Sequence, residues 1–190
     1  MILVSVSAVV IGCYIYIDKN FDSANQKLYK TLPVAKDFTL KQLEKTEQNE
    51  LKQGENYTLS KDGTPFILVH FWASWCIPCT VELPLYKQLA QKFDQNIFKI
   101  VGVLSYDSIS DAIKSNLLKT MFYTQLFDLD GTVAFQFKIK NLPASFLLNP
   151  KRQIIFSLDE PLNEVSTKNF FQKIEAITRG YKSEQQNPQR

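Results

Sequence analysis

Cys76 and Cys79 form a C-x-x-C pair near the middle of the chain. Such a pair belongs either to a zinc site or to a redox-active dithiol. Zinc needs about four ligands, and the other Cys or His side chains of the chain are Cys13, which lies in an apolar run, and His70. The composition therefore favours thiol–disulfide chemistry, and we expect neither a bound metal nor a cofactor.

The residues around the pair predict a strand, a turn and a helix. Residues 66–72 are almost continuously apolar, as in a strand covered on both faces, and residues 77–93 carry apolar side chains at every fourth position. Unpaired N–H groups at a helix start stabilise a thiolate, so we expect Cys76 to be the attacking sulfur. Cys79 lies one turn further along, within disulfide reach, and is expected to resolve the mixed disulfide.

The composition describes one folded domain without a strong charge. The chain has 190 residues, of which 45% are hydrophobic, with 22 Lys and Arg against 19 Asp and Glu. This balance argues against a nucleic-acid partner. Three cysteines are too few for a fold built on disulfides, and one histidine argues against His-rich metal centres and a Ser-His-Asp triad.

The remaining elements alternate in the manner of an α/β domain. Further strands are expected at 97–104, at 144–148 and in a hairpin partner at 153–158, and helices at 108–119, near 131–139 and at 163–179. The charged, Gln-rich stretch 41–55 predicts a short helix or an exposed loop. We expect a membrane anchor or signal segment at 1–18, a spacer at 19–35, the working domain at 36–180 and a polar tail at 181–190.

The chain starts with an apolar run at residues 2–17 that carries no charge. As a helix it would span ~24 Å, slightly less than the ~30 Å hydrocarbon core of a bilayer. Three fates stay open, with a retained signal anchor preferred over a cleaved secretory signal. The third is lipidation, because residues 10–13 are similar to the lipobox of bacterial lipoproteins, in which Cys13 would be acylated.

The segment F-W-A-S-W-C-I-P-C at residues 71–79 resembles the active site of the thioredoxin superfamily, and its continuation to Glu82 and Pro84 is similar to the TlpA/ResA/CcmG (DsbE-like) branch. D-F-T-L at 37–40 and L-P-A-S-F-L-L at 142–148 occur where that branch has them. The resemblance covers about residues 36–180. It implies a thioredoxin fold, in which helices flank a central mixed β-sheet on both faces, and thiol–disulfide exchange with protein substrates.

The resemblance also implies roles for two residues outside the cysteine pair. Pro143 matches the cis-proline that faces the disulfide and leaves the backbone of the preceding residue free to pair with a substrate segment. The alternative is an ordinary proline at a strand entry. Glu82 matches a glutamate that could hold or pass the proton of Cys79, with a raised pKa if it is buried. The alternative is an exposed acid in the first helical turn.

Two further residues are weaker candidates. His70 stands where many thioredoxins carry a buried Asp, and strand alternation places it on the same face as Trp72. It could accept the proton of Cys79, although a hydrogen-bonded core histidine is the preferred interpretation. Trp75 precedes the first cysteine, and we expect it to pack beside the pair with a modest role.

The resemblance implies a catalytic domain tethered to the membrane on its extracytoplasmic (periplasmic) side. It further implies a role in cytochrome c maturation, with apocytochrome c cysteines as substrate and re-reduction by a transmembrane thiol carrier of the DsbD/CcdA type. Two observations oppose parts of this expectation. Residues 144–145 read Ala-Ser instead of the Glu-Thr or Thr-Thr frequent in the family. The lysines after the apolar run, taken alone, place the domain in the cytoplasm: Lys19, Lys27 and Lys30.

We predict a protein-disulfide reductase, and three alternatives remain. A thiol oxidase or isomerase would use the same residues, because direction depends on the reduction potential relative to the compartment. A peroxiredoxin shares the D-F-T-L opening, but residues 71–74 lack the proline which that family carries ahead of its reactive cysteine. A copper-binding thioredoxin-like chaperone would carry a downstream histidine, and none follows His70.

Overall fold

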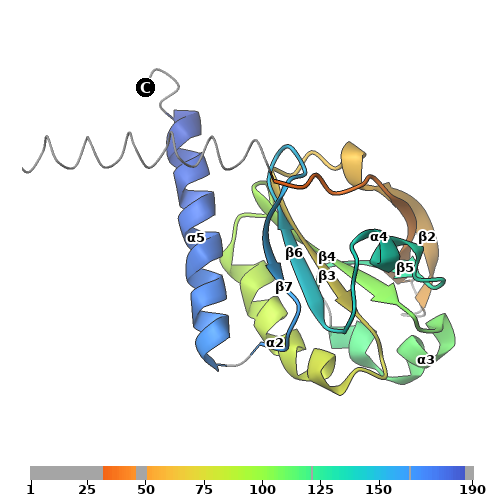
Figure 1. Cartoon of the computed structure of the whole chain (residues 1–190). Helices are drawn as coiled ribbons and strands as arrows, with labels where there is room; N and C mark the ends of the chain where they lie inside the picture. Colours follow the sequence, from red (N-terminus) through yellow and green to blue (C-terminus); the bar gives the residue numbers. More distant parts are fainter. Residues whose placement is uncertain (1–31, 46–50, 121, 163, 187–190) are drawn as a thin grey trace, which may run out of the picture. The chain divides into compact units, whose positions relative to one another are not determined.

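The fold is taken from a computed structural model, which describes residues 32–45, 51–120, 122–162 and 164–186 (Figure 1). Its strands form one seven-stranded mixed sheet in the order β2-β1-β5-β4-β3-β6-β7. The central strands β3, β4 and β5 are parallel, and the other pairs are antiparallel. The strands are β1 (Thr39–Lys45), β2 (Leu51–Thr58), β3 (Phe66–Trp72), β4 (Phe98–Ser105), β5 (Thr124–Asp128), β6 (Ala144–Leu148) and β7 (Ile154–Leu158).

Helices cover both faces of this sheet. Figure 1 shows α2 and α5 on one side of it and α4 on the other. This arrangement confirms the predicted thioredoxin-like α/β fold with a mixed central sheet. The helices are α2 (Ile77–Lys92), α3 (Ile109–Lys114), α4 (Thr132–Gln136) and α5 (Glu164–Gln186), with short 3-10 helices η1 (Leu59–Lys61) and η2 (Leu117–Thr120).

Strand β3 is the centre of the core, and every one of its residues is buried. Its side chains alternate between the two faces of the sheet. Val69 and Phe71 join the cluster that contains residues of α4. Leu68 joins the cluster formed with α2 and α5, in which Leu89 and Ile174 are fully buried. The predicted central strand is therefore confirmed, and its α2 face leads directly to the cysteines.

The stretch 41–55 does not form the expected short helix or exposed loop. Most of it lies in the antiparallel pair β1–β2, whose edge strand carries the polar residues of the Gln-rich stretch. The other side of β1 pairs with β5, where Lys41 stands opposite Phe127. Charged side chains are common on an exposed edge of a sheet, so the composition of this stretch concealed its strands.

The last helix extends past its expected end at Arg179 and continues to Gln186. Packing accounts for the extension, because the rings of Tyr181 and Phe66 pack edge to face with their centroids 5.3 Å apart. The Lys182 ammonium also lies 3.5 Å from the Asp94 carboxylate. These contacts hold the last turns of α5 against the domain, although Gly180 is a weak helix former.

No helix within the described part of the chain is long and apolar enough to cross a membrane. The apolar run at 2–17 and Cys13 lie outside the described residues, as does most of the expected spacer. The predicted anchor or signal segment and the lipidation of Cys13 therefore remain predictions.

Candidate active site

The structure joins Cys76 and Cys79 in a disulfide at the start of α2. Cys76 is the N-cap residue of the helix, and its sulfur accepts a hydrogen bond from the Cys79 N–H at 3.2 Å. Cys76 is 3% exposed and Cys79 is fully buried. A helix N-terminus that directs an N–H at the Cys76 sulfur would stabilise a thiolate there after reduction. The geometry therefore suits Cys76 as the attacking sulfur.

Pro143 immediately precedes β6. The Leu142–Pro143 peptide bond is cis, as expected. Ala144 pairs with Phe71 near the C-terminal end of β3. Strand β6 therefore begins at the end of the sheet at which β3 finishes and α2 starts. Leu142 packs against the apolar cluster that contains both cysteines. The structure thus brings the proline segment and the disulfide together, while a role in substrate binding remains a prediction.

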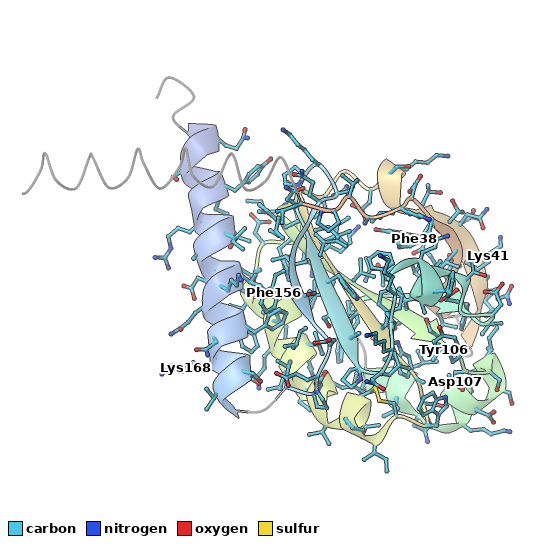
Figure 2. The ribbon with its side chains drawn as sticks, in the orientation of Figure 1. Phe38, Lys41, Tyr106, Asp107, Phe156 and Lys168 are labelled. Carbon is cyan, nitrogen blue, oxygen red and sulfur yellow. A yellow bond between two sulfur atoms is a disulfide. The ribbon has the colours of Figure 1, made fainter. Side chains whose placement is uncertain are left out.

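The loop after β4 braces the segment that leads into the disulfide. The Trp75 indole N–H donates to the Tyr106 carbonyl oxygen at 3.0 Å, and the Ser74 N–H donates to the Asp107 carboxylate at 2.5 Å. Figure 2 shows Tyr106 and Asp107 at the end of the sheet where the yellow disulfide is drawn. Trp75 is 61% exposed and is absent from the described apolar cluster that contains the cysteines, so the expected packing beside the pair is not seen there. Tyr106 and Asp107 are not predicted from the sequence, because Asp107 precedes a helix and is indistinguishable from an ordinary turn residue.

Glu82 is buried in α2, one helical turn after Cys79, with 1% of its surface exposed. Its Oε1 accepts a hydrogen bond from the Leu162 N–H, and its Oε2 has no hydrogen-bond partner among the residues that the structure describes. Burial raises the pKa of Glu82 to about 7, opposed in part by the Leu162 N–H and the nearby Tyr86 hydroxyl. The alternative of an exposed first-turn acid therefore does not hold. The carboxyl group can exchange a proton near neutral pH.

His70 is completely buried on the α2 face of β3. Its Nδ1 lies 3.1 Å from the Ser145 hydroxyl, and its ring packs on that of Tyr86 with centroids 4.0 Å apart. Burial lowers the pKa of His70 to about 3, so the imidazole is neutral under ordinary conditions. This environment is that of the hydrogen-bonded core histidine preferred above. Acceptance of the Cys79 proton by His70 remains a prediction.

Comparison with known proteins places this geometry in a family. Residues 33–157 match the model of the AhpC/TSA family. The chain belongs to the AhpC/TSA family. The match includes β3, the disulfide, α2 and the Pro143 segment, so it covers all of the candidate site residues described so far.

The chain is also similar to individual proteins that are named as thiol-disulfide oxidoreductases. Sporulation thiol-disulfide oxidoreductase A of Bacillus subtilis is 33% identical over 108 residues, which cover 54% of this chain and 63% of that protein. Thiol-disulfide oxidoreductase ResA of Oceanobacillus iheyensis is 28% identical over 156 residues, which cover 81% of this chain and 75% of that protein. Both proteins are named as thiol-disulfide oxidoreductases.

The solved structures agree on the fold. A crystal structure described as a putative thiol:disulfide interchange protein DsbE from Chlorobium tepidum matches with a TM-score of 0.63 at 23% identity. The match covers 77% of this chain and 96% of that one. At this identity the likeness concerns the thioredoxin-like fold alone.

Proposed function

We propose that the chain is a protein-disulfide reductase that works through Cys76 and Cys79. The observation that carries this proposal is the disulfide at the N-terminus of α2, with the Cys79 N–H directed at the Cys76 sulfur. A dithiol in this position combines an activated attacking sulfur with a second sulfur that can close the disulfide.

The reaction balances with the two cysteines alone. The Cys76 thiolate attacks a substrate disulfide, forms a mixed disulfide and releases one substrate thiolate. Cys79 then loses its proton and attacks the Cys76 sulfur, which releases the second substrate thiolate and forms the Cys76–Cys79 disulfide. Two electrons pass to the substrate, and its two thiolates take up two protons. Glu82, one turn from Cys79, is the proposed acceptor of the Cys79 proton, and the backbone of Leu142 before Pro143 is the proposed contact for an extended substrate segment.

The proposal is tested with the full chain, dithiothreitol and insulin, whose reduced B chain precipitates. Faster precipitation than with dithiothreitol alone supports the reductase, and an unchanged rate refutes it. The reduction potential of the cysteine pair then separates a reductant from an oxidase or isomerase. A potential near about −270 mV favours the reductant, whereas one near about −120 mV favours an oxidant.

We further propose that the substrates are protein disulfides outside the cytoplasm, with apocytochrome c among them. The resemblance to the ResA and DsbE type supports this, because one relative is ResA and another, from Yersinia pestis, is named thiol:disulfide interchange protein DsbE. A transmembrane thiol carrier of the DsbD/CcdA type would restore the dithiol.

Cys79→Ala is expected to trap substrates on the protein. Without Cys79 the mixed disulfide on Cys76 cannot be resolved, so it accumulates. Non-reducing gels followed by mass spectrometry identify the trapped proteins, and Cys76→Ala in the same background is the matched control that should trap none. Recovery of apocytochromes supports the maturation role, whereas recovery of unrelated exported proteins contradicts it.

We propose that residues 1–18 tether the domain on the extracytoplasmic side of the membrane. The uncharged run at 2–17 supports a membrane segment. A reporter enzyme that is active only outside the cytoplasm, fused after Arg190, is expected to be active. A fusion that is expressed in full but inactive would contradict the proposed orientation and agree with the lysines that follow the run.

A further inference from the structure

Four polar side chains form a buried row between α2 and the sheet: Glu82, Tyr86, Ser145 and His70. Each of them is at most 1% exposed. The Tyr86 hydroxyl lies 2.8 Å from the Ser145 hydroxyl, which in turn lies 3.1 Å from Nδ1 of His70. Glu82 lies one turn before Tyr86 on α2, near enough for the Tyr86 hydroxyl to lower the pKa of its carboxyl group. The row therefore connects the acid beside Cys79 with the histidine of β3.

At each end of this row, one polar atom has no hydrogen-bond partner within the described residues. These atoms are Glu82 Oε2 and His70 Nε2, and both are buried. Tyr86, Ser145 and neutral His70 each have a single proton to donate. A row of such groups can be fully hydrogen-bonded in two ways only, with all donors pointing toward Glu82 or all pointing toward His70.

The protonation state of Glu82 selects between these directions. An ionised carboxylate can only accept, so Tyr86 donates to Glu82, Ser145 donates to Tyr86, and the Nδ1–H of His70 donates to Ser145. A protonated carboxyl group can donate to the Tyr86 hydroxyl. Tyr86 then donates to Ser145 and Ser145 donates to Nδ1, which leaves the imidazole proton on Nε2.

We propose that the direction of this hydrogen-bond row reverses whenever Glu82 gains or loses its proton, and that His70 changes tautomer while it stays neutral. Protonation adds one proton in total. Glu82 takes it up, the Tyr86 and Ser145 hydroxyl groups turn so that each donates toward His70, and the imidazole proton moves from Nδ1 to Nε2 by exchange with solvent. Given the proposed function, His70, Ser145 and Tyr86 are then positioning residues for the proton acceptor of Cys79.

The surroundings make Glu82 the titrating member of the row. The Leu162 N–H reaches it from the connection between β7 and α5, and the partly buried Tyr123 from the segment before β5 interacts with it electrostatically. Burial raises the pKa values of Tyr86 and Tyr123 above the usual tyrosine range. Burial also holds the pKa of His70 near 3, so of these groups Glu82 alone titrates close to pH 7.

The chain contains one histidine, so its imidazole signals are unambiguous. We expect ¹⁵N NMR of the full chain, labelled at histidine and kept oxidised so that neither cysteine titrates, to show a neutral imidazole between pH 5 and 9. Its proton should move from Nε2 at low pH to Nδ1 at high pH, with a midpoint that coincides with the ¹³C titration of the Glu82 carboxyl group. One tautomer at all pH values, or an imidazolium that forms with a midpoint near 6.5, would overturn the proposal.

Two variants are expected to shift the midpoint of the Glu82 titration in opposite directions. In Ser145→Ala the Tyr86 proton has Glu82 as its remaining acceptor, so the Glu82 midpoint should fall by about 0.5–1 pH unit, and the tautomer should no longer follow pH. In Tyr86→Phe the donor to the carboxylate is lost, so the midpoint should rise by a similar amount. Shifts of the same sign in both variants contradict the proposal.

Matched variants separate this effect from damage to the core. Tyr123→Phe removes another buried hydroxyl near Glu82 but lies outside the row, so the tautomer change should persist. Ser145→Thr retains the hydroxyl and should restore what Ser145→Ala removes. If Ser145→Ala does not fold, the wild-type titration still decides. Because these measurements need no turnover, a normal titration without insulin reduction refutes the proposed function alone, and insulin reduction with a fixed tautomer refutes this inference alone.

Discussion

Replacement of Cys76 with alanine is expected to abolish insulin reduction by the full chain, with a loss of about 10³-fold or more. Cys76 caps α2 and receives the N–H of the first turn, whereas Cys79 lies inside that turn with no exposed surface. Cys79 therefore cannot replace the attacking sulfur in the variant. The rate of insulin precipitation with dithiothreitol as reductant measures the loss.

Cys13→Ala is the matched control for this experiment, since it removes the one cysteine outside the pair. It should reduce insulin at the wild-type rate. Retention of even a tenth of the activity in Cys76→Ala, or a large loss in Cys13→Ala, would contradict the assignment of the attacking sulfur.

The parts of the fold that were predicted correctly are those with a local signal. Strand β3 is apolar throughout because both of its faces are covered, and this pattern is visible in the sequence. The start of α2 follows from a proline in its first turn and from apolar residues four apart. The β6–β7 hairpin was likewise predicted, because two apolar runs flank the turn that contains Pro150.

The elements that were missed depend on contacts distant in the sequence. Strand β5 was not predicted, because it has five residues and a glutamine at its second position. That residue, Gln125, is 6% exposed because its side-chain oxygen accepts a hydrogen bond from the Trp72 indole at 2.9 Å. Nothing near Gln125 in the sequence indicates this partner. The β1–β2 pair was missed for a related reason, since both strands are rich in polar residues and β1 pairs with the distant β5.

The residues of the candidate site also fall into those with a local sequence signal and those that depend on distant contacts. The motif identified Cys76, Cys79 and Pro143 at once, since the C-x-P-C run and the later proline occur in the sequence as such. Tyr86 and Ser145 were missed, because their importance arises from a hydroxyl contact across 59 residues. One signal was available for Tyr86: it lies seven residues after Cys79, which places both on the same face of α2.

Glu82→Gln is expected to remove a pH dependence of stability that burial imposes on the wild type. The pKa of Glu82 is raised from its ordinary value of 4.5 to about 7 in the folded protein. Between these values the folded state binds more protons than the unfolded state, so stability is fully present below about pH 4.5 and declines as pH rises to about 7. With about 1.4 kcal/mol for each pH unit, the decline amounts to roughly 3.5 kcal/mol at most.

Urea unfolding of the oxidised full chain at pH 5 and pH 8 measures this decline. Glutamine cannot ionise and still offers an oxygen to the Leu162 N–H, so Glu82→Gln should lose less stability than the wild type over this interval, by up to about 3 kcal/mol. Glu175→Gln is the matched control, because its partners Lys92 and Arg179 lower the Glu175 pKa and so move its titration away from this interval. Equal pH dependence in Glu82→Gln and the wild type would show that Glu82 is already ionised in the folded protein at pH 5. In that case it could not take up the Cys79 proton near neutral pH.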